Sequence, residues 1–304
     1  MSTAYVALGY RCNSNCLTCP IDPALPRARP VSAGVIKRFL LQRTSYEAVT
    51  FSGGEPTLHP QLSSLAQWCA DQFGARIEIL TSARSLGRGP LVDRLAQVPR
   101  LQLTTAMYAP DETSHDALSG SPGSFRETCD GLRRALDRRI RVVLKTVVSR
   151  RNYRELELLF RTMIERFPEV EDFVIYGTDW TGAARENLAS LFVPNAEVAP
   201  YLEDAVLAIQ EAGRRAQVRL FPLCLLDPAL WEFAAHPDPN DAAGDVLFSP
   251  ESAALDFEVD AGRVQAVCQS CALRRVCGRT WDSYFEVGGV AELRPIVLEG
   301  WEER

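Results

Sequence analysis

The chain has 304 residues, of which 46% are hydrophobic and 24% charged, an ordinary globular composition that suits one large domain, or one domain of about 200 residues with a smaller appendage. The net charge of −6 provides no overall attraction for nucleic acid or for an anionic membrane, and no apolar run approaches the length of a membrane span. We therefore expect a cytoplasmic protein that binds neither of these partners, in a compartment where thiols stay reduced.

Strand-like and helix-like segments alternate along most of the sequence. Strands are predicted at 4–10, 47–52, 75–82, 101–108, 140–148 and 170–177, with a possible seventh at 217–222. Helices are predicted between and after them: one capped by Ser32, one over Leu62 to Phe73, one bearing Leu91 and Leu95, one opening with the capping-box pattern Ser124 to Glu127, one over 152–167 and one around 196–212. Such alternation predicts a parallel sheet. Six units, short of eight, predict an α/β fold built as a partial (β/α)6 TIM-like barrel, whose working end is the carboxyl end of the strands.

Nine cysteines are many for a reducing compartment, and their grouping indicates metal binding rather than disulfides. Three follow the first predicted strand and four lie near the C-terminus: Cys12, Cys16 and Cys19, then Cys224, Cys268, Cys271 and Cys277. The remaining two, Cys69 and Cys129, fall on the apolar faces of predicted helices, where we expect them to pack as small core residues.

The stretch "GYRCNSNCLTCP" has three cysteines but no fourth cysteine or histidine nearby. A structural zinc site normally takes four protein ligands, whereas three thiolates on a 4Fe-4S cluster leave one iron open. The second predicted strand is followed directly by Gly53, Gly54 and Glu55. Taken alone, the cysteines could be half of a zinc site and the glycines an ordinary turn. Their joint placement after successive strands favours a combined role.

In this spacing and context the chain resembles the radical S-adenosylmethionine (SAM) superfamily. The resemblance implies that the open iron chelates the amino and carboxylate groups of SAM. Reduction of that cluster then cleaves SAM to a 5′-deoxyadenosyl radical, which abstracts hydrogen from a substrate. It also implies an electron donor such as flavodoxin or ferredoxin.

The same resemblance assigns cofactor contacts. Gly53, Gly54 and Glu55 match the motif that contacts the methionine amino group, and Gly53 is expected to let the backbone approach bound SAM closely. Thr81 and Ser82 stand where related enzymes contact the methionine or ribose of SAM. Thr18 replaces the aromatic residue that many members carry before the third cysteine, so it offers no ring to stack on adenine.

The C-terminal cysteines resemble the SPASM or Twitch extensions of one branch of that superfamily. The resemblance implies one auxiliary 4Fe-4S cluster on Cys224, Cys268, Cys271 and Cys277, with every iron bound by protein. Structural zinc on the same thiolates is the alternative. The chain would then divide into a barrel at 1–215 and an auxiliary-cluster domain at 216–304. A fully ligated cluster suits electron transfer, and therefore oxidative outcomes.

The expected function is oxidative modification or cross-linking of a ribosomally made peptide. The alternative is a small-molecule dehydrogenase or epimerase of secondary metabolism, acting on a sugar or aminocyclitol. A non-catalytic Fe-S or zinc scaffold is disfavoured, because it leaves the open iron and the Gly-Gly-Glu motif without a purpose. Lys145, inside the apolar stretch "VVLKTVV", is expected to meet an anionic or carbonyl partner, since an unpaired buried lysine is costly.

Overall fold

A computed structural model describes residues 3–25, 29–234, 245–247 and 265–297. An eight-stranded sheet, parallel throughout, has the strand order β7-β6-β5-β4-β3-β2-β1-β8. The strands are β1 (Thr3–Ala7), β2 (Ala48–Ser52), β3 (Arg76–Leu80), β4 (Leu101–Ala106), β5 (Arg141–Val147), β6 (Asp172–Tyr176), β7 (Arg215–Arg219) and β8 (Asp245–Leu247). The sheet is open, which confirms the predicted α/β partial barrel.

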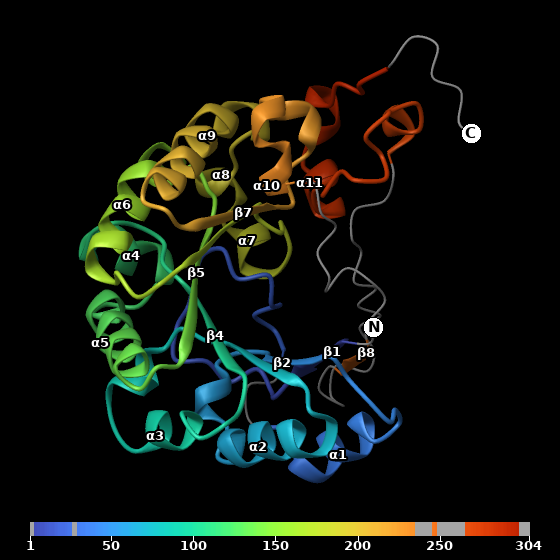
Figure 1. Ribbon diagram of the computed structural model, residues 1–304. Helices are drawn as coiled ribbons and strands as arrows, with labels where there is room; N and C mark the ends of the chain where they lie inside the picture. The colour runs from blue at the N-terminus through green and yellow to red at the C-terminus, as the bar shows by residue number, and fades with distance from the viewer. Residues whose placement is uncertain (1–2, 26–28, 235–244, 248–264, 298–304) are drawn as a thin grey trace.

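The helices lie mainly on the convex side of this curved sheet (Figure 1). They are α1 (Ala33–Leu40), α2 (Leu62–Phe73), α3 (Leu91–Leu95), α4 (Glu112–Ser119), α5 (Ser124–Asp137), α6 (Leu156–Arg166), α7 (Gly182–Glu186), α8 (Leu188–Leu191), α9 (Asn195–Glu211), α10 (Trp231–Ala234) and α11 (Asp282–Glu286). In the described part of the chain, none of them is both long and apolar enough to cross a membrane.

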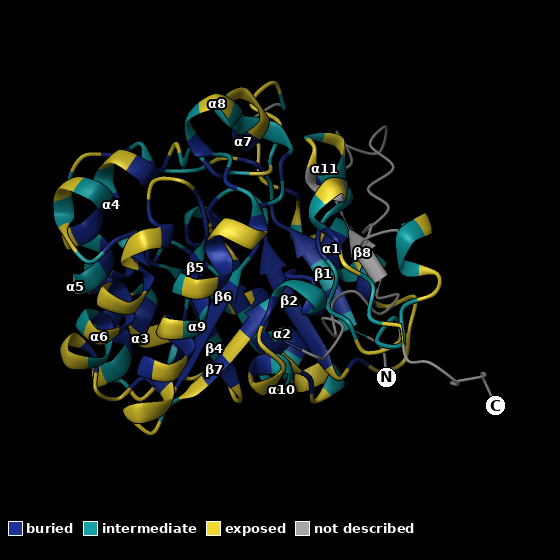
Figure 2. Cartoon of the chain, turned by 90° about the horizontal axis from the view of Figure 1, so that it is seen from above, coloured by how far each residue is buried: buried dark blue, intermediate teal, exposed yellow. Residues whose placement is uncertain are grey.

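Alternation along the strands separates an apolar outer face from a polar inner face. Phe51, Ile79 and Leu144 belong to the core between sheet and helices, where buried residues concentrate (Figure 2). The intervening positions, such as Thr50 and Glu78, therefore point to the inside of the barrel. Cys69 is fully buried in the outer core and Cys129 packs against it, as predicted.

Most predicted helix boundaries agree with the structure, but the capping box at Ser124 does not form. Ser32 caps α1 through a bond from the Val35 amide, as expected. At α5 the N-cap is Gly123, with φ of 82°, and Ser124 is the first helical residue. The Ser124 hydroxyl instead donates to Asp116 at 2.8 Å, and this carboxylate also accepts from the Phe125 amide at 2.8 Å. The Asp116 carboxylate of α4 thus takes the place of the predicted Ser124–Glu127 capping box at the start of α5.

Six of the described helices and strands were not predicted: α4, α7, α8, β8, α10 and α11. Helix α4 is short and mostly polar, with only His115, Leu118 and Ser119 buried, so its apolar periodicity is weak. Asp111 caps it by accepting from the Ser114 amide at 3.0 Å. Strand β7, the possible seventh strand, forms two residues before its predicted start and ends at Arg219.

Candidate functional site

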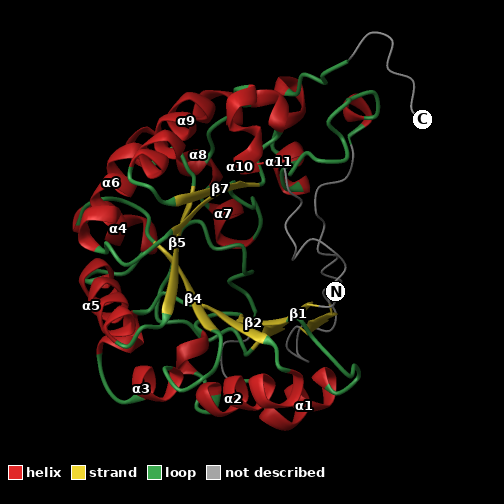
Figure 3. Ribbon diagram, viewed as in Figure 1, coloured by secondary structure: helices red, strands yellow, loops and turns green. Residues whose placement is uncertain are grey.

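The cysteine loop, residues 8–20, follows β1 and runs along the inner side of the sheet (Figure 3). Cys12, Cys16 and Cys19 are all partly buried. Burial, with smaller contributions from the charges of Cys19 and Cys12, raises the pKa of the Cys16 thiol to about 12. Such mutual effects require neighbouring thiols, so the loop brings the three predicted ligands together.

The Gly-Gly-Glu motif packs directly against this loop. The amides of Gly54 and Glu55 donate to the carbonyls of Gly9 and Arg11, both at 2.8 Å. A Cβ atom on Gly53 would lie 2.3 Å from the Gly9 carbonyl oxygen, and one on Gly54 would lie 2.3 Å from that of Arg11. Gly53 also has φ of 108°, which favours glycine. The close approach at these glycines is therefore to the cysteine loop, which the sequence did not reveal.

Glu55 is the centre of a buried hydrogen-bond network at the ends of β2 and β3. Its side chain is 4% exposed, and its carboxylate accepts from the hydroxyls of Thr57, Thr81 and Ser82 at 2.6, 2.5 and 2.8 Å. The amides of Thr57 and Ser82 donate to it as well, at 3.0 and 2.7 Å. The structure thus brings together Glu55, Thr81 and Ser82, and their mutual bonds fix the carboxylate in one orientation.

The far side of the cysteine loop is held by the ends of α4 and α7. The Asn15 and Leu17 amides donate to carbonyls at the end of α4, at 3.1 and 2.9 Å, and the Ala184 amide donates to the Cys19 carbonyl at 3.2 Å. Gly120 and Gly182 come equally close, because a Cβ atom on either would lie 2.3 or 2.4 Å from a carbonyl oxygen of the loop. Segments that follow β4 and β6 thereby help to shape the cysteine loop.

An ion pair braces the same loop from the β3 side. Arg84 donates to the Ser14 hydroxyl at 3.0 Å and to the Asn13 carbonyl, and it pairs with Glu127 of α5 at 2.8 Å. The arginine side chain is only 12% exposed, so the pair is partly desolvated. Neither residue was predicted to contact the cysteine loop: Glu127 was assigned to a capping box, and the position of Arg84 just beyond a strand end was its only signal.

Tyr108, just beyond β4, contacts the cysteines from the β4 side. Desolvation raises the pKa of its hydroxyl, and that hydroxyl is hydrogen-bonded to Cys16 and Thr18. Thr18 is buried. The Tyr108 amide donates to Nδ1 of His115 at 3.3 Å. Burial lowers the pKa of His115 to about 4, so this ring is neutral near pH 7.

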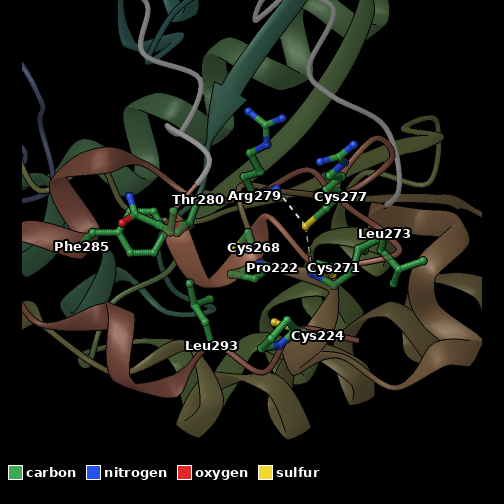
Figure 4. A pocket seen from close by; sticks show the side chains of 14 residues that line it. Pro222, Cys224, Cys268, Cys271, Leu273, Cys277, Arg279, Thr280, Phe285 and Leu293 are labelled. Atoms are coloured by element: carbon green, nitrogen blue, oxygen red, sulfur yellow. Dashed lines mark hydrogen bonds between the residues drawn. The ribbon is translucent and has the colours of Figure 1, made fainter. Parts of the chain in front are cut away.

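The four C-terminal cysteines line one pocket (Figure 4). Burial raises the pKa of Cys268, and the charges of Cys224, Cys277 and Cys271 raise it further. The amides of Leu223 and Arg279 donate to the Cys277 sulfur, each at 3.4 Å. The remaining polar or charged residues of the lining are Gln265, Arg274, Arg279 and Thr280, with no carboxylate among the lining residues of this pocket.

In neither cysteine group do the side chains converge on a position that could hold one metal ion. Among the described residues, no three His, Cys, Asp or Glu side chains are arranged tightly enough to hold one metal ion. The structure therefore gathers seven predicted ligands into two neighbourhoods without forming a single-ion site in either.

The segment after β6 connects the two cysteine neighbourhoods. On one side, the Trp281 indole donates to the Gly177 carbonyl at 3.0 Å, and the Ser283 hydroxyl donates to Asp179 at 2.8 Å. Burial raises the pKa of Asp179. On its other side the segment bonds to the cysteine loop, through Ala184 and Cys19. Residues 177–184 thus contact both Trp281 and Ser283, which follow the C-terminal cysteines in the chain, and Cys19 of the cysteine loop.

Comparison with known proteins places the chain in a family. The family model of the Radical SAM superfamily matches residues 6–163, more than half of the chain. The "AdoMet-dependent heme synthase" of Methanosarcina barkeri is 26% identical over 153 residues, which cover 49% of this chain and 43% of that protein. The chain spans less than half the length of the curated relatives it matches.

Two solved structures share the fold. Native anSMEcpe with bound AdoMet has a TM-score of 0.66 at 14% identity, covering 91% of this chain and 88% of that one. Streptococcus suis SuiB bound to precursor peptide SuiA has a TM-score of 0.60 at 16% identity, covering 71% of this chain and 48% of that one. The family match includes the cysteine loop and the Gly-Gly-Glu motif. The chain belongs to the radical SAM superfamily.

Proposed function

We propose that Cys12, Cys16 and Cys19 hold a 4Fe-4S cluster whose fourth iron binds SAM. The observation that carries this proposal is the meeting of three thiols with the Gly-Gly-Glu motif at the carboxyl ends of β1 and β2. The donor set fits such a cluster, because three thiolates are what leave one iron open. When bound and reduced, the cluster supplies an electron that cleaves SAM to methionine and a 5′-deoxyadenosyl radical. A flavodoxin or ferredoxin is the proposed electron donor.

The chain's own residues would position the cluster through hydrogen bonds to its ligand sulfurs. The Ser14 amide donates to the Cys12 sulfur at 3.4 Å, and the Tyr108 hydroxyl bonds to Cys16. Such bonds to ligand sulfurs tune the reduction potential of a cluster. Glu55, already fixed by Thr81 and Ser82, orients the motif that the resemblance assigns to the methionine amino group.

For the C-terminal pocket we propose an auxiliary 4Fe-4S cluster on Cys224, Cys268, Cys271 and Cys277. Its support is the lining of one pocket by all four thiols, with two amides aimed at the Cys277 sulfur. Structural zinc is the competing occupant. The proposed barrel (1–215) and auxiliary domain (216–304) meet within β7, so the sheet continues across the division. A cytoplasmic location, where the thiols stay reduced, is part of the proposal.

The proposed reaction is oxidative modification of a peptide. It is supported by the likeness in fold to SuiB, whose solved complex contains a precursor peptide. An auxiliary cluster would accept the electron that remains after hydrogen abstraction, and residues 177–184 connect its pocket to the cysteine loop. The second candidate is a small-molecule substrate, favoured by the heme synthase among the sequence relatives.

SAM cleavage tests the first part of this proposal. Anaerobically reconstituted protein with dithionite and SAM should form 5′-deoxyadenosine, and the Cys16→Ala variant should form none. Cys129→Ala is the matched control, because this cysteine lies at the edge of the hydrophobic core and should leave cleavage intact. If Cys16→Ala and the unmodified protein formed equal amounts of 5′-deoxyadenosine, the proposed cluster could not be bound by this loop.

The substrate is tested separately. A precursor peptide encoded beside the gene should lose about two mass units on turnover, the mass of two hydrogens removed in a dehydrogenation or a cross-link. Retention of the peptide mass, together with SAM cleavage stimulated by a small molecule, would favour the second candidate.

A further inference from the structure

A single acidic side chain lies among neutral polar groups on the inner face of β2, β3 and β4. Glu78 of β3 is partly exposed, and its cross-strand partners are Thr50 of β2 and Gln102 of β4. The Glu78 carboxylate accepts from the Thr50 hydroxyl at 3.2 Å, from the Gln102 side-chain amide at 3.1 Å and from the Thr104 hydroxyl at 2.5 Å. Donors from both neighbouring strands therefore hold this carboxylate in one place.

The charge of Glu78 is not balanced by these donors, because all three are neutral. The other inner-face carboxylate of strands β1 to β7, that of Asp172, instead pairs with Arg141 at 2.9 Å and with Arg215 at 2.7 Å. Among the ion pairs that the described residues form with one another, none includes Glu78. A partly desolvated carboxylate in such surroundings is stabilised when an opposite charge approaches it.

One oxygen of this carboxylate can accept a further hydrogen bond. Oε1 receives the bonds from Gln102 and Thr104, whereas Oε2 receives only the bond from Thr50. Each carboxylate oxygen has two lone-pair sites, so Oε1 is fully used and Oε2 is not. A donor on a bound molecule can therefore reach Oε2 without displacing the groups that hold Glu78.

Glu78 lies on the same strand as the residues that fix Glu55. Thr81 and Ser82, whose hydroxyls donate to Glu55, follow β3 directly. At a rise of about 3.3 Å per residue, Thr81 lies about 10 Å beyond Glu78 along the chain. A molecule that binds Oε2 can therefore extend along the inner face towards the end of the sheet where the cysteine loop and Glu55 lie.

We propose that Glu78 binds a positively charged nitrogen of the substrate inside the barrel and thereby orients the substrate towards SAM. This inference rests on the proposed function and narrows its substrate class to molecules with a cationic nitrogen, whether a basic side chain of a peptide or an amino sugar. The cation donates to Oε2, while Thr50, Gln102 and Thr104 keep the carboxylate in position. Glu78 selects a cation over a neutral donor because a charge-assisted hydrogen bond is the stronger of the two.

A fluorinated amine provides a direct binding test. The line width of 2-fluoroethylamine, an ammonium ion at neutral pH, is measured by ¹⁹F NMR at subsaturating probe concentration. The holoprotein is first saturated with SAM, so that the site for the methionine amino group is already filled. Glu78→Gln should reduce the broadening about tenfold, which corresponds to about 1.4 kcal/mol. The neutral probe 2-fluoroethanol should respond equally to the variant and to the unmodified protein.

Two variants serve as matched controls. Thr104→Val removes a donor to Glu78 but keeps its charge, so it should retain the broadening. Glu157→Gln makes the same change of charge on the outside of the barrel, at an exposed acid of α6 that pairs with Arg161 at 2.9 Å, and should retain it as well. Glu78→Asp draws the charge back by one methylene. It should lose part of the broadening and serves if Glu78→Gln does not fold.

Competition identifies the source of the cationic nitrogen. A blocked lysine peptide, acetyl-Ala-Lys-Ala-amide, and glucosamine are each added to the unmodified protein together with 2-fluoroethylamine. Stronger displacement of the probe by the peptide supports a peptide side chain, and stronger displacement by glucosamine supports an amino sugar. Displacement by neither would contradict the inference.

Three further results would overturn it. The first is equal broadening of 2-fluoroethylamine by the unmodified protein and by Glu78→Gln. The second is an equal reduction in Thr104→Val, which would show that the network and not the charge is required. The third is an equal loss of SAM affinity in Glu78→Gln, which would assign Glu78 to the amino group of SAM. Failure of the proposed function differs from all of these, because the unmodified protein would then form no 5′-deoxyadenosine.

Discussion

Glu55 accepts five hydrogen bonds while almost fully buried, and all five come from residues that follow β2 and β3. Glu55→Gln places an amide NH2 group where an oxygen now accepts, and the buried hydroxyls of that side lose their acceptor. We expect the free energy of unfolding to fall by about 3 kcal/mol, since each lost bond to a charged group costs about 1.5–3 kcal/mol. Urea unfolding measures this loss.

The control for this change is Glu112→Gln on α4, whose carboxylate is exposed and pairs with Arg126 at 2.9 Å. It should cost little, because exposed ion pairs contribute little. Equal losses in the two variants would mean that the Glu55 network does not stabilise the fold.

His115 gives the molecule a pH-dependent stability. Its pKa is 6.5 in an ordinary environment and about 4 in the folded protein, because burial disfavours the charged ring. Between these values the unfolded state binds more protons, so this contribution is complete above pH 6.5 and is lost as the pH falls towards 4. The total loss is about 3 kcal/mol.

Unfolding free energies of the unmodified protein and of His115→Asn, measured between pH 4 and 7, test this origin. Asparagine keeps an acceptor for the Tyr108 amide but does not titrate, so the fall of stability with acid should be shallower in the variant. Parallel curves would show that carboxylates alone cause the acid sensitivity.

At the scale of elements, the cysteine loop derives its shape from the segments around it. Gly53→Ala forces a Cβ atom to within 2.3 Å of the Gly9 carbonyl oxygen, so the loop must shift and the three thiols with it. We expect iron bound after reconstitution to fall towards the amount held by the C-terminal site alone, about half of the normal content. Iron analysis after gel filtration measures this change.

Gly288→Ala is the control for Gly53→Ala, because it introduces similar backbone strain without the steric clash. Gly288 has φ of 116°, close to the 108° of Gly53, but a Cβ atom there meets nothing within 4 Å. It should keep its iron. Normal iron in Gly53→Ala would show that the contact with Gly9 does not shape the loop.

The elements could be predicted where apolar periodicity is strong, and were missed where packing decides. The strands up to Tyr176 and the long helices α2, α5, α6 and α9 carry continuous apolar patterns. Helix α4 is mostly polar, and its C-terminal residues hold the cysteine loop through long-range bonds that no local pattern encodes. The same holds for Arg84 and Glu127, which are 43 residues apart and meet only in the fold. The cysteines could be predicted as two candidate groups of ligands because metal ligation, where it occurs, imposes a spacing on them.

At the scale of the whole molecule, two groups of cysteines are joined through residues 177–184. We expect about eight irons per reconstituted chain, and about four in a variant with Cys12, Cys16 and Cys19 changed to Ala. Metal analysis by mass spectrometry counts iron and zinc together. About four irons with one zinc in the unmodified protein would assign the C-terminal pocket to zinc.

The central claim is that SAM binds iron at the N-terminal cysteines and nowhere else in the chain. Electron paramagnetic resonance of the dithionite-reduced protein, recorded with and without SAM, tests it most directly. We expect SAM to shift the signal of the unmodified protein and of a Cys268→Ala, Cys271→Ala variant, but not the signal that remains after Cys12, Cys16 and Cys19 are changed to Ala. A SAM-dependent shift in that last variant would place the open iron in the C-terminal pocket and would exclude SAM binding at the N-terminal cysteines alone.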